Sequence, residues 1–149
     1  MDNGYIVKQA NIEYHDEGYF FGEDYGTVLF ETVFETEEQA NQAVKEYVRD
    51  LPVNDCFVEA LFHWEGGAFP EGMFDTEKFS ALVTSHEAFK GAGGYIYIDG
   101  EYFTFSGNLT LGDLLQGLAQ CLTNDDPKRM TQLVKNQFDI QRVKIVRES

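Results

Sequence analysis

The spacing of apolar and polar residues predicts a β-hairpin followed by a helix at the start of the chain. Rough alternation of β-forming residues predicts a strand over Tyr5–Tyr14 and a returning strand over Thr27–Phe34. From residue 36 to residue 51, apolar residues recur at helical spacing. Thr36, with Gln39 three residues later, forms a capping box that predicts the first turn of this helix. The start of the chain is therefore expected to be β-β-α.

The middle of the chain predicts a strand, a helix and a hairpin. Asp55–Trp64 is short and rich in aromatic and β-branched residues, and we interpret it as a strand, although its Glu59-Ala60-Leu61 also fits a short buried helix. A helix is expected from Thr76 to Phe89, with Asp75 as its N-cap. Asp99-Gly100, between two runs of tyrosine, phenylalanine and isoleucine, predicts a two-residue hairpin turn.

Two helices and a closing strand are expected in the last third. Thr110, with Asp113 three residues later, predicts one helix start, and Asp126-Pro127 predicts another. Ile140–Val146 has the alternation of a strand whose basic residues point outward. The complete order, β-β-α-β-α-β-β-α-α-β, predicts an α+β fold with a mostly antiparallel sheet and three to four helices.

Length and composition favour a single folded domain over residues 1–149. The chain has 149 residues, of which 43% are hydrophobic and 15% aromatic, enough for a core and too many aromatic residues for a disordered chain. No run approaches the roughly 20 apolar residues that cross a bilayer, and Met1–Gly4 lacks the features of a signal peptide. Cys56 and Cys121, far apart in the sequence, are expected to be free thiols. We therefore expect a cytoplasmic protein.

The charge of the chain is strongly negative and unevenly distributed. Residues 1–127 contain 24 acidic and five basic residues, a net charge of −19, whereas residues 128–149 have a net charge of +4. Direct binding of nucleic acid or of an anionic membrane requires the opposite sign over most of the surface. A basic protein partner would be attracted. Solubility alone also explains the acidity.

No motif in the sequence indicates catalysis, a cofactor or a metal. The three histidines, His15, His63 and His86, lie in different elements and have no ligand-type spacing. Cys56 lies near His63 in the sequence, but without a known nucleophile motif. We therefore expect no cofactor and no metal, and we favour a non-enzymatic function over an enzymatic one.

Two aromatic and acidic segments, residues 15–25 and 64–75, are the candidate interface. Large aromatic side chains anchor interfaces, and surrounding carboxylates select a basic partner. The alternative is that these aromatic side chains fold back and close the end of the core. The candidate residues are Tyr19, Phe20, Phe21, Glu23, Asp24, Tyr25, Trp64, Glu65, Phe69, Glu71 and Phe74.

These observations lead to one functional hypothesis and two alternatives. The first is a non-enzymatic inhibitor or immunity-type protein that engages a basic protein, with nucleic-acid mimicry by the acids of residues 13–38 as a special case. The second is a small enzyme or ligand-binding domain with a pocket between the sheet and the two aromatic loops. The third is homo-oligomerisation through the hairpin at residues 95–105, against the repulsion of a net charge of −15 per chain.

Overall fold

The fold was obtained as a computed structural model, which describes residues 2–16, 18–62, 74–98, 101–122 and 128–145. The described part contains strands and helices in the order β-β-β-β-α-α-α-β-β-α-α-β. They are β1 (Asp2–Gln9), β2 (Ile12–His15), β3 (Gly18–Phe21), β4 (Thr27–Val28), α1 (Glu37–Arg49), α2 (Cys56–Phe62), α3 (Thr76–Ser85), β5 (Gly93–Ile98), β6 (Glu101–Ser106), α4 (Leu111–Gln120), α5 (Lys128–Lys135) and β7 (Phe138–Ile145).

All strand pairs in the described residues are antiparallel, and the α+β fold class is confirmed. The described residues contain five helices, more than the three to four expected, because α2 takes the place of a predicted strand. β1 lies between β4 and β7, and it pairs with β7 along its whole length, from Asp2 opposite Ile145 to Gln9 opposite Phe138. β2 pairs with β3, and β5 pairs with β6, as two separate hairpins. The strands therefore form one three-stranded sheet and two ribbons.

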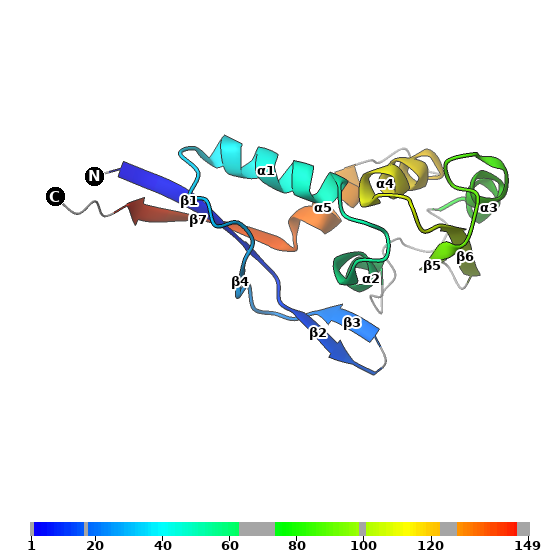
Figure 1. The fold of residues 1–149 in the computed structure, drawn as a ribbon, viewed down its shortest axis with the longest axis horizontal. Coiled ribbons are helices and arrows are strands. Elements are labelled where there is room, and N and C mark those ends of the chain that lie inside the picture. Colours follow the sequence, from blue (N-terminus) through cyan, green and yellow to red (C-terminus); the bar gives the residue numbers. More distant parts are fainter. Residues whose placement is uncertain (1, 17, 63–73, 99–100, 123–127, 146–149) are drawn as a thin grey trace.

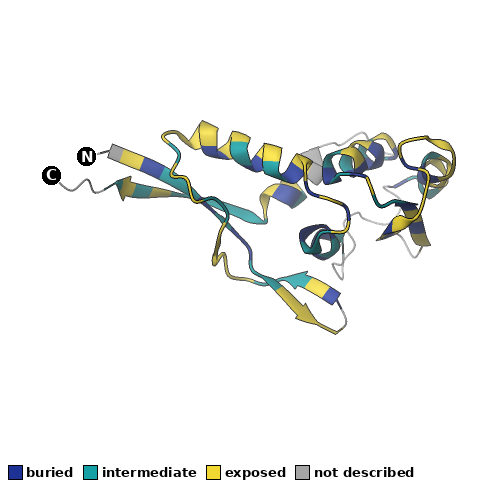
Figure 2. Cartoon of the chain, in the orientation of Figure 1, coloured by how far each residue is buried: buried dark blue, intermediate teal, exposed yellow. Residues whose placement is uncertain are grey.

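The elements extend along one axis (Figure 1). The β1–β7 pair and both termini lie at one end, and α3 with the β5–β6 hairpin lies at the other. Helices α1 and α4 follow each other along one side, α2 lies near the middle, and the β2–β3 hairpin projects from the opposite side. Buried residues face the space between these elements, as Figure 2 shows, and form one connected core that includes Val7, Phe57, Phe79, Phe105 and Leu114.

Three helix starts predicted from single side chains are confirmed. Thr36, Asp75 and Thr110 are the N-caps of α1, α3 and α4, and the side chain of each accepts a hydrogen bond from the backbone N–H three residues later. The side chain of Gln39 in turn accepts from the backbone N–H of Glu35, at 3.1 Å, rather than from that of Thr36. α3 is shorter than expected, because it ends at Ser85 and not at Phe89.

The strand predicted over Asp55–Trp64 is wrong, because Cys56–Phe62 forms the helix α2. The Asp55 side chain accepts a hydrogen bond from the backbone N–H of Phe57 at 2.8 Å, and the Asp55 carbonyl accepts from Glu59 at 3.2 Å. Both interactions favour a helical turn. Phe57, Val58, Ala60 and Leu61 are buried. The short apolar run thus reflects a buried helix rather than a buried strand.

The long hairpin predicted at the start of the chain is divided into smaller pieces. The expected strand over Tyr5–Tyr14 is interrupted at residues 10–11, where the Ala10 and Asn11 N–H groups donate to the carbonyls of Gln137 and Asp24. Of the expected strand over Thr27–Phe34, only Thr27–Val28 pairs regularly, and Phe34 forms an isolated bridge with Tyr5. The segment 15–25, expected to be a long loop or the irregular tip of a hairpin, contains the strand β3, which forms a hairpin with β2.

The β5–β6 hairpin follows the prediction and separates its two faces sharply. Ile98 pairs with Glu101, so the connection is Asp99-Gly100, which lies outside the described residues. Ile96, Ile98, Phe103 and Phe105 are buried, whereas Tyr95, Tyr97 and Tyr102 are exposed. Gly94 belongs to this packing, because a Cβ atom there would lie 2.5 Å from the Phe105 ring. The inner face therefore joins the core and the outer face displays tyrosines.

In the part of the chain that the structure describes, no helix has both the length and the apolar character needed to span a membrane.

Candidate functional site

A cleft of about 540 Å³ lies between α2, the β5–β6 hairpin and the tip of the β2–β3 hairpin. We call it the tyrosine–carboxylate cleft. α2 and the turn before it supply one wall, the outer face of β5–β6 supplies the second, and Asp16 comes from the β2–β3 hairpin. Its described lining residues are Asp16, Val53, Asn54, Asp55, Val58, Glu59, Phe62, Tyr95, Ile96, Tyr97 and Tyr102.

The tyrosines of the cleft are placed by the alternation of the β5–β6 hairpin. Tyr97 and Tyr102 are directly opposite in the ladder, and their ring centroids are 4.8 Å apart at an interplanar angle of 61°. Tyr95 lies two residues before Tyr97 on the same face, with its ring 6.4 Å from that of Tyr102. The exposed fractions of Tyr95, Tyr97 and Tyr102 are 60%, 52% and 71%. Three large rings are thus displayed together at the surface.

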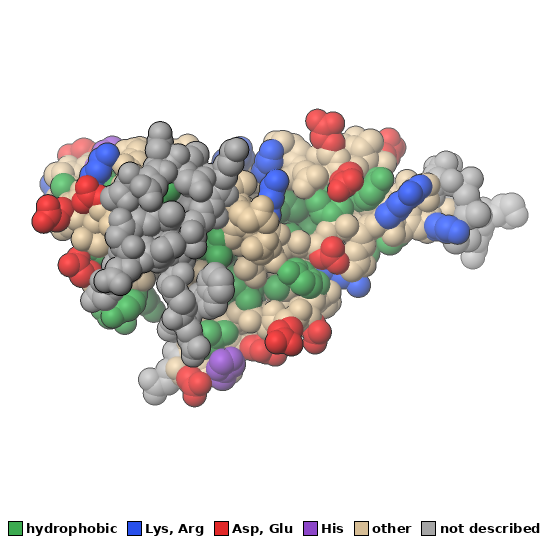
Figure 3. Space-filling model, turned by 180° about the vertical axis from the view of Figure 1, so that it is seen from behind, with side chains coloured by type: hydrophobic (Ala, Val, Ile, Leu, Met, Phe, Trp, Pro, Cys, Tyr) green, Lys and Arg blue, Asp and Glu red, His purple; other side chains and the backbone are tan. Residues whose placement is uncertain are grey.

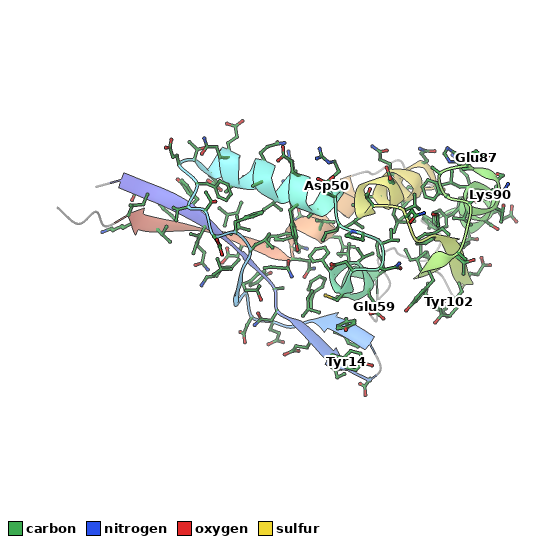
Figure 4. The ribbon with its side chains drawn as sticks, in the orientation of Figure 1. Tyr14, Asp50, Glu59, Glu87, Lys90 and Tyr102 are labelled. Atoms are coloured by element: carbon green, nitrogen blue, oxygen red, sulfur yellow. The ribbon has the colours of Figure 1, made fainter. Side chains whose placement is uncertain are left out.

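Three carboxylates line the same cleft, and no lysine or arginine appears among its described lining residues. Asp55 immediately precedes α2, Glu59 lies in the first turn of α2, and Asp16 lies in the turn of the β2–β3 hairpin. Figure 4 shows Glu59, Tyr102 and Tyr14 along the same lower side of the molecule, on three different elements. The local electrostatic potential is therefore negative, in agreement with the net charge of the chain.

Glu59 and Tyr95 are electrostatically coupled. The pKa of Tyr95 is raised above the ordinary tyrosine value, chiefly because the negative charge of Glu59 opposes formation of the phenolate; partial burial and Tyr102 act in the same direction. Tyr95 therefore keeps its proton at neutral pH and can donate a hydrogen bond. A side-chain hydrogen bond between Tyr95 and Glu59 acts in the same direction, so the two side chains already interact across the cleft.

The Cys56 thiol, at the start of α2, does not have the properties of an activated nucleophile. The pKa of the Cys56 thiol is raised, first by desolvation and then by the nearby Asp55 carboxylate, so the thiol is neutral at pH 7. A nucleophilic cysteine needs the opposite shift. Among the described residues, no three His, Cys, Asp or Glu side chains are grouped so that they could hold a metal ion. His63 lies outside the described residues.

The structure distributes the predicted interface residues over different environments. Tyr19 is partly exposed, with its ring 5.1 Å from that of Tyr14, and Phe20 stacks on His15. Phe21 contacts Phe57 of the core, and Phe74 is buried. These last two side chains close the core, which is the alternative considered for the aromatic segments.

The remaining predicted interface residues lie either at the surface or outside the described chain. Glu23 and Asp24 are exposed, and the Tyr25 hydroxyl donates to the Asn136 carbonyl. Trp64, Glu65, Phe69 and Glu71 lie outside the described residues.

Sequence reasoning did not single out Tyr95, Tyr97, Tyr102, Asp55 or Glu59 as site residues. Tyr95-Ile96-Tyr97-Ile98 is predicted as a strand of a hairpin whose edge could pair with a second copy, but tyrosine and isoleucine are both β-formers and their alternation does not say which face is outside. Three tyrosines at alternate positions of a predicted hairpin were the available signal. The packing of this tyrosine-bearing face beside α2 depends on tertiary contacts, and no local sequence pattern predicts it.

No protein-family model, no curated protein sequence and no solved structure matches this chain. Its function is therefore inferred from the chemistry of the site.

Proposed function

We propose that this chain is a non-enzymatic binding protein that engages a basic protein partner through the tyrosine–carboxylate cleft. The observation that carries the proposal is the convergence of three carboxylates and three exposed tyrosine rings in one cleft whose described lining contains no cation. Tyrosine gives a large contact area at a low cost in conformational entropy. Lysine and arginine side chains bind both to carboxylates and to the faces of aromatic rings.

An inhibitor or immunity-type contact fits the charge distribution better than duplex mimicry. Duplex DNA carries a charge every ~1.7 Å along its axis, so a mimic needs a continuous row of carboxylates. Glu13 and Asp16 are exposed on the β2–β3 hairpin, whereas Glu37 and Glu38 are exposed at the start of α1. Figure 1 separates these two places widely. In Figure 3, acidic side chains are spread over several separate parts of the visible face, and basic side chains lie among them as well as at the β1–β7 end. This distribution fits a compact contact at the cleft better than a continuous acidic row.

A ligand-binding pocket is the second candidate function, and the size of the cleft favours it. Small-molecule sites commonly enclose about 300–1,000 Å³, and the cleft measures about 540 Å³. The raised pKa values of Cys56 and Tyr95 leave both groups protonated at neutral pH, which supports binding rather than catalysis. A basic ligand, with a cation that reaches Glu59, would suit the same chemistry.

The proposal is tested by comparing what the wild-type chain and a cleft variant retain from host lysate. The variant combines Glu59→Gln with Tyr102→Ala, and Glu87→Gln, on the connection after α3, is the charge-matched control for the first change. We expect the wild type and the Glu87→Gln control to retain one basic protein at low ionic strength and to lose it at high ionic strength. The Glu59→Gln/Tyr102→Ala variant should not retain it.

Two results would contradict this proposal. One is equal retention of the basic protein by the wild type and the cleft variant, which would move the contact to another surface. The other is retention of many unrelated basic proteins by the wild type, the cleft variant and the control alike. That result would show that binding depends on net charge and not on the cleft. In either case circular dichroism must first show that the cleft variant is folded.

A further inference from the structure

A second hollow, of about 340 Å³, lies between α1, α4 and α5, and we call it the helix groove. Its apolar floor is supplied by all three helices, at positions that follow one face of each. These residues are Val44, Val48, Leu115, Ala119 and Val134. The three helices do not cover this part of the core completely, because Leu115 and Ala119 are only partly buried. An apolar surface is thus accessible at the bottom of a groove.

The rim of the helix groove is basic. Lys45, Arg49 and Lys135 line it, and no carboxylate appears among its described lining residues. This is the reverse of the whole sequence, in which 26 acidic residues outnumber 11 basic ones.

Two of the three rim cations are available to a ligand. Arg49 already pairs with Asp50, because its Nε lies 3.0 Å from the Asp50 Oδ1 atom. The exposed Lys45 and Lys135 have no ion-pair partner within 4.0 Å in the part of the chain that the structure describes. They therefore provide positive charge that no described carboxylate neutralises by an ion pair.

We infer that the helix groove binds a small anionic amphiphile, a carboxylate with an apolar chain. The apolar chain would cover Val48, Leu115 and Val134, and the carboxylate would lie at the rim near Lys45 or Lys135. A volume of about 340 Å³ is at the lower end of the range of small-molecule sites. A protein helix docked here would need an interface of roughly 1,200 Å² or more to be stable, so the size of the groove favours a small ligand.

The probe for this inference is decanoate, used below the concentration at which it forms micelles. A protein with isotope-labelled methyl groups is titrated and followed by NMR. We expect saturable shifts of the Val44, Val48, Leu115 and Val134 methyl signals, and no shift of Val58 or Ile96 in the tyrosine–carboxylate cleft. Ala119→Phe fills the floor and should abolish the shifts, whereas Ser80→Phe, on the exposed face of α3, adds the same ring elsewhere and should preserve them.

The role of the rim is tested by charge reversal. Lys45→Glu with Lys135→Glu should weaken decanoate binding about ten-fold, because both exposed cations at the rim become anions that repel the carboxylate. Lys78→Glu with Lys90→Glu gives the same net charge and should leave the affinity within about two-fold. Decanol, which has the chain without the charge, should not distinguish the two double variants.

Three results would overturn the inference. The first is the absence of saturable shifts of the methyl signals of Val44, Val48, Leu115 and Val134. The second is an equal loss of affinity in the two charge-reversed proteins, which would make the effect one of net charge. The third is decanoate binding that survives Ala119→Phe, which would place the ligand outside the helix groove.

Discussion

The tyrosine–carboxylate cleft and the helix groove are two concave surfaces with opposite chemistry on one small fold. The cleft is lined by tyrosine rings and three carboxylates, and the groove by aliphatic side chains and three cations. The cleft is displayed by a β-hairpin and a short helix, whereas the groove lies among three helices. The comparison teaches that the net charge of −15 describes the average surface and conceals a local reversal of sign.

The strongest test of this comparison asks whether both regions depend on one core. Phe57, which is 1% exposed, packs under the cleft against Phe138, and Leu114, which is fully buried, lies in α4 beside the groove. Phe57→Ala should lower the free energy of unfolding by about 3–5 kcal/mol and Leu114→Ala by about 2–5 kcal/mol. Urea denaturation should show a single transition in each variant, reported equally by methyl signals from both regions.

Separate transitions for the two regions would contradict the prediction of a single domain over residues 1–149. The clearest evidence would be folded-state methyl signals from α4 that persist at urea concentrations where the cleft of the Phe57→Ala variant has already unfolded. In that case the connected core of the described residues would be two cooperative units rather than one.

The next largest effect is expected at the tyrosines of the cleft, if the cleft contacts a basic partner. Tyr102→Ala removes the most exposed of the three rings and should lower the affinity by about 1.5–2 kcal/mol, or roughly ten- to thirty-fold. Tyr102→Phe keeps the ring and should retain most of the affinity. Titration calorimetry with the captured partner measures both changes.

The helix groove provides the control for that prediction. Lys45→Glu, at the basic rim of the helix groove, should not weaken binding of the basic partner. It should slightly increase the association rate, because it makes the protein more acidic. A loss of affinity in Lys45→Glu equal to that in Tyr102→Ala would show that the partner does not distinguish the two regions.

A smaller effect is expected from the cap of the helix that borders the groove. The Thr110 hydroxyl accepts a hydrogen bond from the Asp113 N–H at 3.3 Å, and Thr110→Ala should cost about 1 kcal/mol of stability. Thr110→Ser keeps the hydroxyl and should restore most of it. Hydrogen exchange should accelerate in α4 and remain unchanged in β5–β6. Equal acceleration in both elements would mean that α4 does not open independently.

The parts of the fold that were predictable from sequence are those fixed by neighbouring residues. The caps at Thr36, Asp75 and Thr110 each satisfy a backbone group only three residues away, so their pattern is local. The β5–β6 hairpin is specified by a two-residue turn and its flanking β-formers in the same way. The segment of α2 was assigned to a strand because a short, mostly apolar segment fits a buried helix and a buried strand about equally well.

The cleft could not be predicted because it joins distant parts of the chain. Asp16, Glu59 and Tyr102 come from a hairpin turn, a helix and a second hairpin. The acidic character of the site was expected from composition. Its location on α2 and β5–β6 was set by which faces became buried, and that depends on tertiary packing rather than on local propensity.

The smallest expected effect, and the sharpest test of the cleft geometry, is the titration of Tyr95. Its pKa is raised first by the charge of Glu59, so Glu59→Gln should lower it toward the ordinary tyrosine value. The raised pKa in the fold means that the unfolded chain releases this proton first. The contribution of Tyr95 to the free energy of unfolding is therefore fully present below a pH of about 10, the ordinary tyrosine pKa. It is lost as the pH rises through the pKa of Tyr95 in the folded protein. NMR of the Tyr95 ring Cζ measures the titration directly, and Glu87→Gln is the control of equal charge.

An unchanged Tyr95 pKa in Glu59→Gln would mean that the carboxylate does not face the ring. The α2 and β5–β6 walls would then not meet at these two residues. If Glu59→Gln does lower the Tyr95 pKa, this pKa can also report whether a ligand occupies the tyrosine–carboxylate cleft. A lysine or arginine side chain bound in the cleft would place a positive charge beside the same phenol and reverse the influence of Glu59. The Tyr95 pKa should then fall when the basic partner binds, and an anionic amphiphile in the helix groove should leave it unchanged. One titration curve thus distinguishes which of the two surfaces a ligand has reached.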